Sequence, residues 1–226
     1  MNNPTANKVA IIDCGIGNLH SVSRACEKVG LNTVITYDKN VIESSIAVIL
    51  PGMGAFGDAM ANLKKMDLIN PIIDFASSGK YMMGVCLGMQ LLMSESSEFG
   101  TQKGLGIING DCRRFSNTGA GDKKIRVPQI MWNKIYANHS EKFDSKSPLA
   151  NVNNNEYMYF VHSYYVVPEK EENILSLTTY EDFEYCSSIK QNNIFAFQFH
   201  PEKSGKKGLE IYKSFASLIS ENKNQS

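Results

Sequence analysis

The chain has 226 residues, of which 42% are hydrophobic and only 7 are proline, and this composition argues against a disordered or collagen-like protein. Lysine and arginine total 23 and are balanced by 23 aspartates and glutamates, so no net charge draws the chain to nucleic acid or to a membrane surface. The start at residues 1–8 is polar, and no apolar run reaches the roughly 18–20 residues of a membrane helix. We therefore expect a cytoplasmic protein.

Apolar strands alternate with helical segments through the first hundred residues. Short runs rich in branched side chains predict buried strands at 8–14, 32–37, 45–50 and 80–86. Helices are expected at 19–29, after the glycine-rich turn at 51–59, at 71–78 with Asn70 as N-cap and Pro71 in the first position, and at 87–94. This alternation predicts right-handed crossovers and a mostly parallel sheet.

After residue 104 the pattern changes to closely spaced strand candidates separated by polar turns. These candidates lie at 104–115, 134–137, 157–167, 174–180, 184–190 and 194–200. They predict an antiparallel extension of the parallel core. Residues 206–222 predict an amphipathic helix whose apolar face carries Leu209, Tyr212, Phe215, Ala216 and Ile219. The polar stretch 138–156 is expected to be a mobile loop.

Five cysteines are spread along the chain without any C-x-x-C pair, namely Cys14, Cys26, Cys86, Cys112 and Cys186. Their odd number and their spacing argue against a disulfide framework or a zinc site. Most free cysteines behave as small buried hydrophobic residues. A role for any one of them must therefore come from its surroundings.

Cys86 has such surroundings, because Gly84 and Gly88 flank it in the sequence GVCLG between a predicted strand and a predicted helix. This is the G-x-nucleophile-x-G pattern of a nucleophile elbow, in which a sharp turn projects the side chain from the strand end. The N-terminus of the following helix favours a thiolate, and the backbone N–H of Leu87 can bind an oxyanion. A structural cysteine in a tight turn is the alternative.

A partner for this cysteine is found in FAFQFHPEKS, residues 195–204. A thiol of pKa about 8.5 needs a base to react as a thiolate at neutral pH. Pro201 favours an extended conformation at His200, so His200 and Glu202 are expected on one side of the chain, where the carboxylate can orient the imidazole. A histidine at a strand end beside a solvated glutamate is the alternative.

A second glycine-rich turn follows the strand at 45–50, in the sequence Pro51-Gly52-Met53-Gly54. Glycines there allow main-chain N–H groups to approach a reacting atom and to adopt unusual dihedral angles. If the turn lies beside Cys86, it can supply the second oxyanion donor, directly or after a peptide flip. A tight turn without a ligand is the alternative.

Taken together, these stretches resemble the class I (triad) glutamine amidotransferases along nearly the whole chain. Within that family they are similar to the glutaminase subunits of imidazole glycerol phosphate synthases. The motifs that carry the resemblance are DCGIGNLHSV, PGMGAF, GVCLGMQLL, KGLGIINGDCRRF, YFVHSYY and FHPEKSG. The resemblance implies an α/β fold, a flavodoxin-like three-layer sandwich with a mostly parallel central sheet and an antiparallel extension, formed by one glutamine amidotransferase domain over residues 1–226.

The resemblance also implies the chemistry, which is hydrolysis of L-glutamine to glutamate and ammonia through a cysteine thioester. Cys86 would be the nucleophile, His200 the acid and base, and Glu202 the residue that orients His200. No cofactor and no metal are implied.

For substrate and oxyanion binding the resemblance implies a further set of residues around the nucleophile. Met53, Gly54 and Leu87 would lie at the oxyanion hole. Gln90 and Gly52 would help to bind glutamine. His162 is expected near the site or near an interface.

The implied partner is a (β/α)₈ cyclase subunit that forms a heterodimer with this chain and uses the ammonia to make imidazole glycerol phosphate. Lys203 and the region of Trp132 would face it. The chain departs from the family pattern V-P-H-M-G-W-N, because Gln129 replaces the histidine and Met131 the glycine. A paralogue that supplies ammonia elsewhere, for example to amidation of a sugar, a stand-alone γ-glutamyl hydrolase and a catalytically silent regulator are the alternatives.

Overall fold

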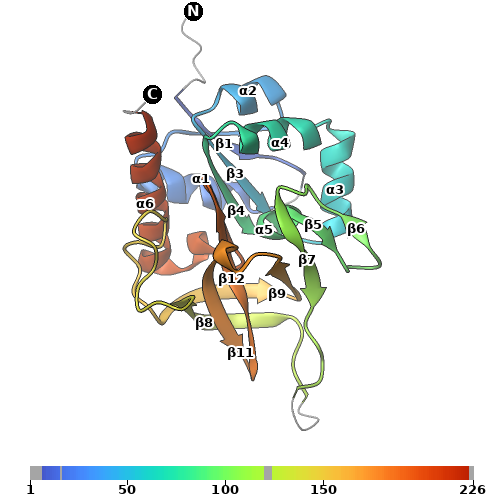
Figure 1. Ribbon diagram of the computed structural model, residues 1–226. Coiled ribbons are helices and arrows are strands. Elements are labelled where there is room, and N and C mark those ends of the chain that lie inside the picture. Colours follow the sequence, from blue (N-terminus) through green and yellow to red (C-terminus); the bar gives the residue numbers. More distant parts are fainter. Residues whose placement is uncertain (1–6, 16, 120–123, 224–226) are drawn as a thin grey trace, which may run out of the picture.

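Five parallel strands form the centre of this computed structural model, which describes residues 7–15, 17–119 and 124–223 (Figure 1). Their order in the sheet is β2 (Thr33–Thr36), β1 (Val9–Ile12), β3 (Ala47–Gly52), β4 (Tyr81–Cys86) and β13 (Ile194–Phe197). The strand predictions in this part of the chain are therefore confirmed. Residues 1–6 of the polar start and Ile16 of the GIGN turn lie outside the described residues.

Helices cover both faces of this parallel sheet, because each buried strand carries apolar side chains on both sides. Alternate residues of β1 belong to two separate hydrophobic clusters, with Val9 and Ile11 in one and Ala10 and Ile12 in the other. The first cluster is covered by α1 (Leu19–Lys28) and α6 (Gly205–Lys223), and the second by α2 (Lys39–Ser44), α3 (Phe56–Lys65) and α4 (Ile69–Ser77). The result is the expected three-layer α/β architecture.

The remaining strands continue the sheet from β13, mostly in antiparallel pairs. Beyond β13 the order is β12 (Phe183–Gln191), β10 (Tyr164–Pro168), β7 (Ile108–Arg114), β5 (Met93–Ser96) and β6 (Gln102–Lys103). A branch leads from β12 through β11 (Ile174–Tyr180) and β8 (Gln129–Ala137) to β9 (Glu156–His162). The predicted antiparallel extension is confirmed. Among the described residues, no helix is long and apolar enough to span a membrane.

Three helix boundaries differ from the prediction. Helix α3 begins at Phe56, within the stretch 51–59 that was expected to be a turn. The helix expected at 87–94 is only α5 (Leu87–Leu91), because Met93–Ser96 instead pairs in parallel with β7. The helix expected from Pro71 begins at Ile69 with Leu68 as its N-cap, so the N-cap assignment to Asn70 was wrong. Pro71 is accommodated because the first turn of a helix contains N–H groups without intrahelical partners.

The structure of two further segments was not predicted from the sequence. Helix α2 has six residues, too few for a hydrophobic period to be seen in the sequence, and Asp38 caps it by accepting from the Asn40 N–H. The stretch 138–156 has no long helix or strand but buries Phe143, Leu149 and Val152. Within the described residues, short 3₁₀ helices lie at Glu171–Asn173 and at Pro201–Lys203.

Candidate active site

Cys86 ends β4 in a backbone conformation that residues with a side chain rarely adopt. Its φ is 55° and its ψ is −113°, and α5 begins at the next residue. A Cβ on Gly88 would overlap the carbonyl oxygen of Leu50, and one on Gly84 would come within 2.9 Å of the Ala196 Cβ. Only glycine therefore fits on either side, and the tight packing keeps Cys86 in its strained turn.

The glycine-rich turn after β3 lies directly beside Cys86. In the parallel register Gly52 is the partner of Cys86, so the chain leaves β3 at the point where β4 ends. Met53 and Gly54 line the same cavity as Leu87, and Gly54 has a φ of +91°. Gly52 instead packs behind Leu87 and does not line the cavity, although it was predicted to bind substrate.

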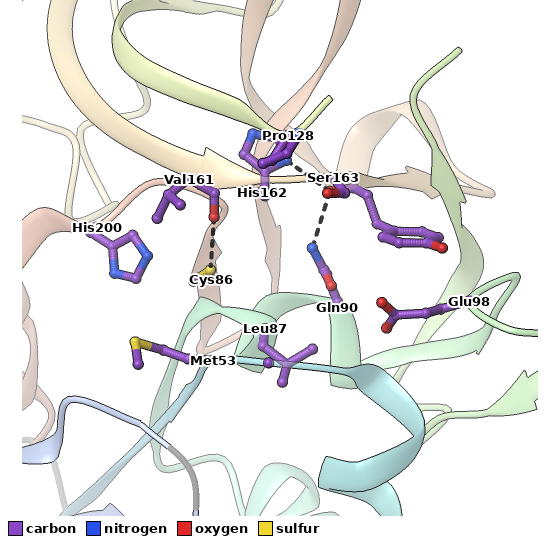
Figure 2. Close-up of a pocket in the computed structure, with 12 residues that line it drawn as sticks. Met53, Cys86, Leu87, Gln90, Glu98, Pro128, Val161, His162, Ser163 and His200 are labelled. Carbon is purple, nitrogen blue, oxygen red and sulfur yellow. Dashed lines mark hydrogen bonds between the residues drawn. The ribbon is translucent and has the colours of Figure 1, made fainter. Parts of the chain in front are cut away.

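His200 and Glu202 form a buried pair next to the thiol. His200 Nδ1 donates to Glu202 Oε1 at 2.7 Å, and the two side chains are only 3% and 2% exposed. His200 itself is extended before Pro201, as predicted, but the residues after it form the 3₁₀ turn at Pro201–Lys203, because the Lys203 N–H bonds back to the His200 carbonyl. His200 Nε2 has no hydrogen-bond partner among the described residues, and Figure 2 shows the imidazole facing Cys86.

The charge on His200 follows from these contacts. Burial by itself lowers the pKa of His200, but charge interactions with Cys86 and Glu202, together with the hydrogen bond to Glu202, outweigh burial and raise it to about 9. The imidazolium form therefore dominates at neutral pH. Burial disfavours the charged form of a thiol, and it therefore raises the pKa of Cys26 to about 12 and those of Cys112 and Cys186 further still.

A cavity of about 370 Å³ opens above Cys86, within the range of roughly 300–1,000 Å³ that is usual for small-molecule sites (Figure 2). Its lining comes from the ends of β4 and β9, from α5, from the start of β10, from the residue before β8 and from the segments that follow β3, β5, β9 and β13. The lining residues are Met53, Gly54, Cys86, Leu87, Gln90, Glu98, Pro128, Val161, His162, Ser163, Tyr164 and His200.

Gln90 projects from α5 into this cavity with a fixed side-chain orientation. Its Nε2 donates to the Tyr164 carbonyl at 3.1 Å and to Gln198 Oε1 at 3.0 Å. Both amide protons are thereby used, and the Gln90 Oε1 is left as an acceptor for a bound molecule.

Glu98 was missed by the sequence analysis. Among the described residues that line the cavity, it is the only carboxylate. Its Oε2 accepts a hydrogen bond of 2.6 Å from the N–H of Phe56, the first residue of α3. No motif surrounds Glu98, and the contact joins residues 42 positions apart in the chain. Only the three-dimensional structure brings this negative charge to the site.

His162 also lines the cavity but is held neutral. Its Nδ1 donates to the Tyr164 carbonyl at 2.8 Å, and its Nε2 lies 3.2 Å from the Tyr185 hydroxyl. Burial dominates over this hydrogen bond and lowers the pKa of His162 to about 4.

This lowered pKa predicts a loss of stability in acid. Unfolded His162 binds a proton below pH 6.5, whereas the folded protein resists it down to about pH 4, so the free energy of unfolding should fall with pH across this window. The expected contribution is on the order of 3 kcal/mol. Denaturant unfolding of wild type and His162→Asn at pH 7 and pH 4.5 measures it, and the variant should lose less stability. An equal pH dependence in both proteins would contradict the assignment.

The predicted interface residues lie outside the cavity on one exposed face. The Trp132 ring lies 6.1 Å from the Tyr159 ring, and Lys203 Nζ lies 5.8 Å from that same ring. Met131 on β8 is also exposed, whereas Gln129 is buried, pairs with His162 in the β8–β9 register and accepts from the Tyr185 hydroxyl. The two departures from the family pattern therefore lie in different environments, since Met131 is exposed and Gln129 is buried beside His162.

Comparison with known proteins extends over nearly the whole chain. The model of the family described as "Glutamine amidotransferase class-I" matches residues 10–217. The imidazole glycerol phosphate synthase subunit HisH of Geobacter sulfurreducens is 41% identical over 213 residues, which is 93% of this chain and 99% of that protein. HisH of Bacillus subtilis is 39% identical and covers 95% of this chain and 98% of its own length.

Solved structures show the same fold at low identity. A crystal structure of a glutamine amidotransferase has a TM-score of 0.67 at 17% identity and covers 94% of this chain and 98% of its own. The structure of PurLQS from Thermotoga maritima has a TM-score of 0.70 at 16% identity, with the same two coverages. At these identities the likeness concerns the arrangement of the sheet and the helices.

Proposed function

This chain belongs to the class I glutamine amidotransferase family, and from that membership we propose that it is the glutaminase subunit of an imidazole glycerol phosphate synthase, active in histidine biosynthesis. The observation that carries the chemistry is the thiol of Cys86, held at a strained strand end beside the buried pair of His200 and Glu202. Residues 1–226 act as one glutamine amidotransferase domain, since the described strands share a single sheet.

The reaction uses these three residues in two steps. The Cys86 thiolate adds to the side-chain carbonyl carbon of glutamine, and the His200 imidazolium gives its Nε2 proton to the departing nitrogen. Ammonia leaves and a γ-glutamyl thioester remains on Cys86. Neutral His200 then takes a proton from water, whose oxygen attacks the thioester and releases glutamate. Glu202 keeps the imidazole oriented and stabilises its positive charge throughout.

The cavity supplies groups that suit the polar ends of glutamine. The Glu98 carboxylate offers a counter-charge to the α-ammonium group, and the Gln90 Oε1 accepts from N–H groups of the substrate. The oxyanion that forms during attack would be bound by the backbone N–H of Leu87 and by an N–H of the Gly52–Gly54 turn. Gly52 then contributes through the position of its main chain, since its Cα packs behind Leu87.

Ammonia is proposed to pass to a cyclase subunit that binds as the other half of a heterodimer. The exposed part of β8 suits this contact, because Ile130, Met131 and Trp132 are 59%, 42% and 47% exposed and offer apolar side chains on both faces of the strand. Lys203 lies near Trp132 and adds a positive charge beside Tyr159. The partner must make room for the Met131 side chain. We place the complex in the cytoplasm, where the five cysteines would remain free thiols.

Selective modification of Cys86 tests the proposed nucleophile. A glutamine analogue that alkylates thiols should label Cys86 and stop ammonia release, because Cys86 lies beside the His200–Glu202 pair, whereas burial raises the pKa of Cys26, Cys112 and Cys186. Peptide mapping by mass spectrometry locates the label, and Cys86→Ser serves as the unlabelled control. Label on Cys14 or Cys112, with activity lost, would contradict the assignment.

A further inference from the structure

Gln198 is a fully buried amide that the mechanism above does not use. It follows β13 directly and lies two residues before His200, and its backbone N–H donates to the Ser187 carbonyl at 2.9 Å. This bond extends the pairing of β13 with β12 by one residue and holds the backbone of Gln198 in place. Its side chain is thereby directed toward α5 and the end of β4, where it contacts Gln90 and Cys86.

The hydrogen bonds around Gln198 determine the orientation of two side-chain amides, those of Gln90 and Gln198. The Tyr164 carbonyl can only accept, so the Gln90 atom that contacts it must be the Nε2 donor. That same Nε2 contacts Gln198 at 3.0 Å, so the Gln198 atom there must be the Oε1 acceptor. Gln198 Nε2 is consequently the end that points at Cys86 Sγ, at 3.9 Å.

Two contacts of Cys86 Sγ stabilise different protonation states of the sulfur. The Val161 carbonyl, 4.0 Å away, can only accept and therefore suits the thiol. The Gln198 amide can donate and therefore suits the thiolate, because a hydrogen bond to the charged form stabilises that form. Gln198 thus joins the substrate-binding amide of Gln90 to the nucleophile through one buried side chain.

We propose that Gln198 is a positioning residue with two effects, orienting the Gln90 amide toward glutamine and donating an N–H to the Cys86 thiolate. This inference rests on the proposed glutaminase function of the same site. The contact with sulfur shortens when the thiol ionises, since the negative charge attracts the N–H. A hydrogen bond to a charged group is worth about 10- to 100-fold in an equilibrium or rate.

The two effects can be separated with iodoacetamide, which alkylates a thiolate without needing Gln90. In the full chain, Gln198→Met should slow alkylation of Cys86 by about 10-fold or more, whereas Gln90→Met should slow it less, because the Gln198 amide is still present beside the sulfur. In the glutaminase assay with the cyclase present, Gln90→Met should mainly raise KM, and Gln198→Met should both raise KM and lower kcat. Gln198→Glu keeps the acceptor for Gln90, so it should lower kcat with KM close to that of wild type.

A matched control is Gln191→Met, since Gln191 is a hydrogen-bonded glutamine at the end of β12 that donates to the Ile107 carbonyl and does not line the cavity. It should keep wild-type alkylation and kinetics. Wild-type alkylation and kcat in both Gln198 variants would overturn the inference while leaving the glutaminase proposal intact. Absence of glutaminase activity in the wild-type complex would instead overturn the proposed function itself.

Discussion

Replacing His200 with alanine should lower glutaminase turnover by about 10³- to 10⁶-fold, the range expected when a triad member is removed. The imidazole carries the proton to the departing ammonia and then accepts one from water, and no other described residue in the cavity can do both. His162 is the nearest candidate, but its pKa is lowered to about 4 and its Nδ1 proton is held by the Tyr164 carbonyl. Steady-state release of glutamate measures the loss.

Glu202→Gln should cost less than the loss of His200, because the tight turn at Pro201–Lys203 still holds the imidazole near the thiol. The variant should nevertheless shift the pH dependence of turnover. Glu202 is one of the groups that raise the pKa of His200, so without its charge the imidazolium should be lost at lower pH. Wild-type turnover in His200→Ala would show that the triad is assigned wrongly.

Binding of the cyclase with its substrate should raise glutaminase turnover by at least about 10²-fold, the typical value of one oxyanion donor. A free glutaminase would release ammonia to solvent, so we expect the site to be incompletely organised in the isolated chain. The Pro51–Gly54 turn suits this control, because it lies beside Cys86 and its glycines make a peptide flip inexpensive. A carbonyl would face the oxyanion in the inactive orientation, and an N–H in the active one.

Variants of this turn should suppress activation without removing the nucleophile. Gly54 has a φ of +91°, which valine rarely adopts, so Gly54→Val should favour one orientation of the turn. Gly52→Pro should have the same effect by restricting the chain at the end of β3. Alkylation of Cys86 should stay close to that of wild type in both. Gly57→Ala is the control, since a Cβ at that helical position meets the Gln102 side chain at an ordinary 3.6 Å.

The sequence was most informative where local chemistry and the fold require the same residues. Gly84 is needed for the close packing of β4 against β13 and α5, and Gly88 for that of α5 against β3, so the motif predicted the strand end and the helix start together. The central parallel strands were also predictable, because a buried parallel strand must be apolar on both faces, whereas β5, β6 and the first half of β8 were not predicted. Because β3 and β4 are neighbouring parallel strands, Gly52 at the end of β3 lies beside Cys86 at the end of β4.

Features that depend on contacts between distant segments could not be predicted. The end of α5 at Leu91 is decided by the pairing of β5 with β7, and not by a local helix stop signal. Glu98 is held at the cavity by its bond to the start of α3, and Gln198 is joined to the lining residue Gln90 by a buried hydrogen bond. Each is an ordinary polar residue in the sequence, and only its partner makes it part of the site.

The central claim is that this chain is a glutaminase whose site is completed by a cyclase partner. The most direct test is to measure steady-state ammonia and glutamate release by the isolated chain and by its complex with the cyclase and the substrate of that cyclase. We predict low activity in the isolated chain and an increase of at least about 10²-fold in the complex. Full activity in the isolated chain, unchanged by the cyclase, would contradict this account and would indicate a stand-alone hydrolase of γ-glutamyl bonds.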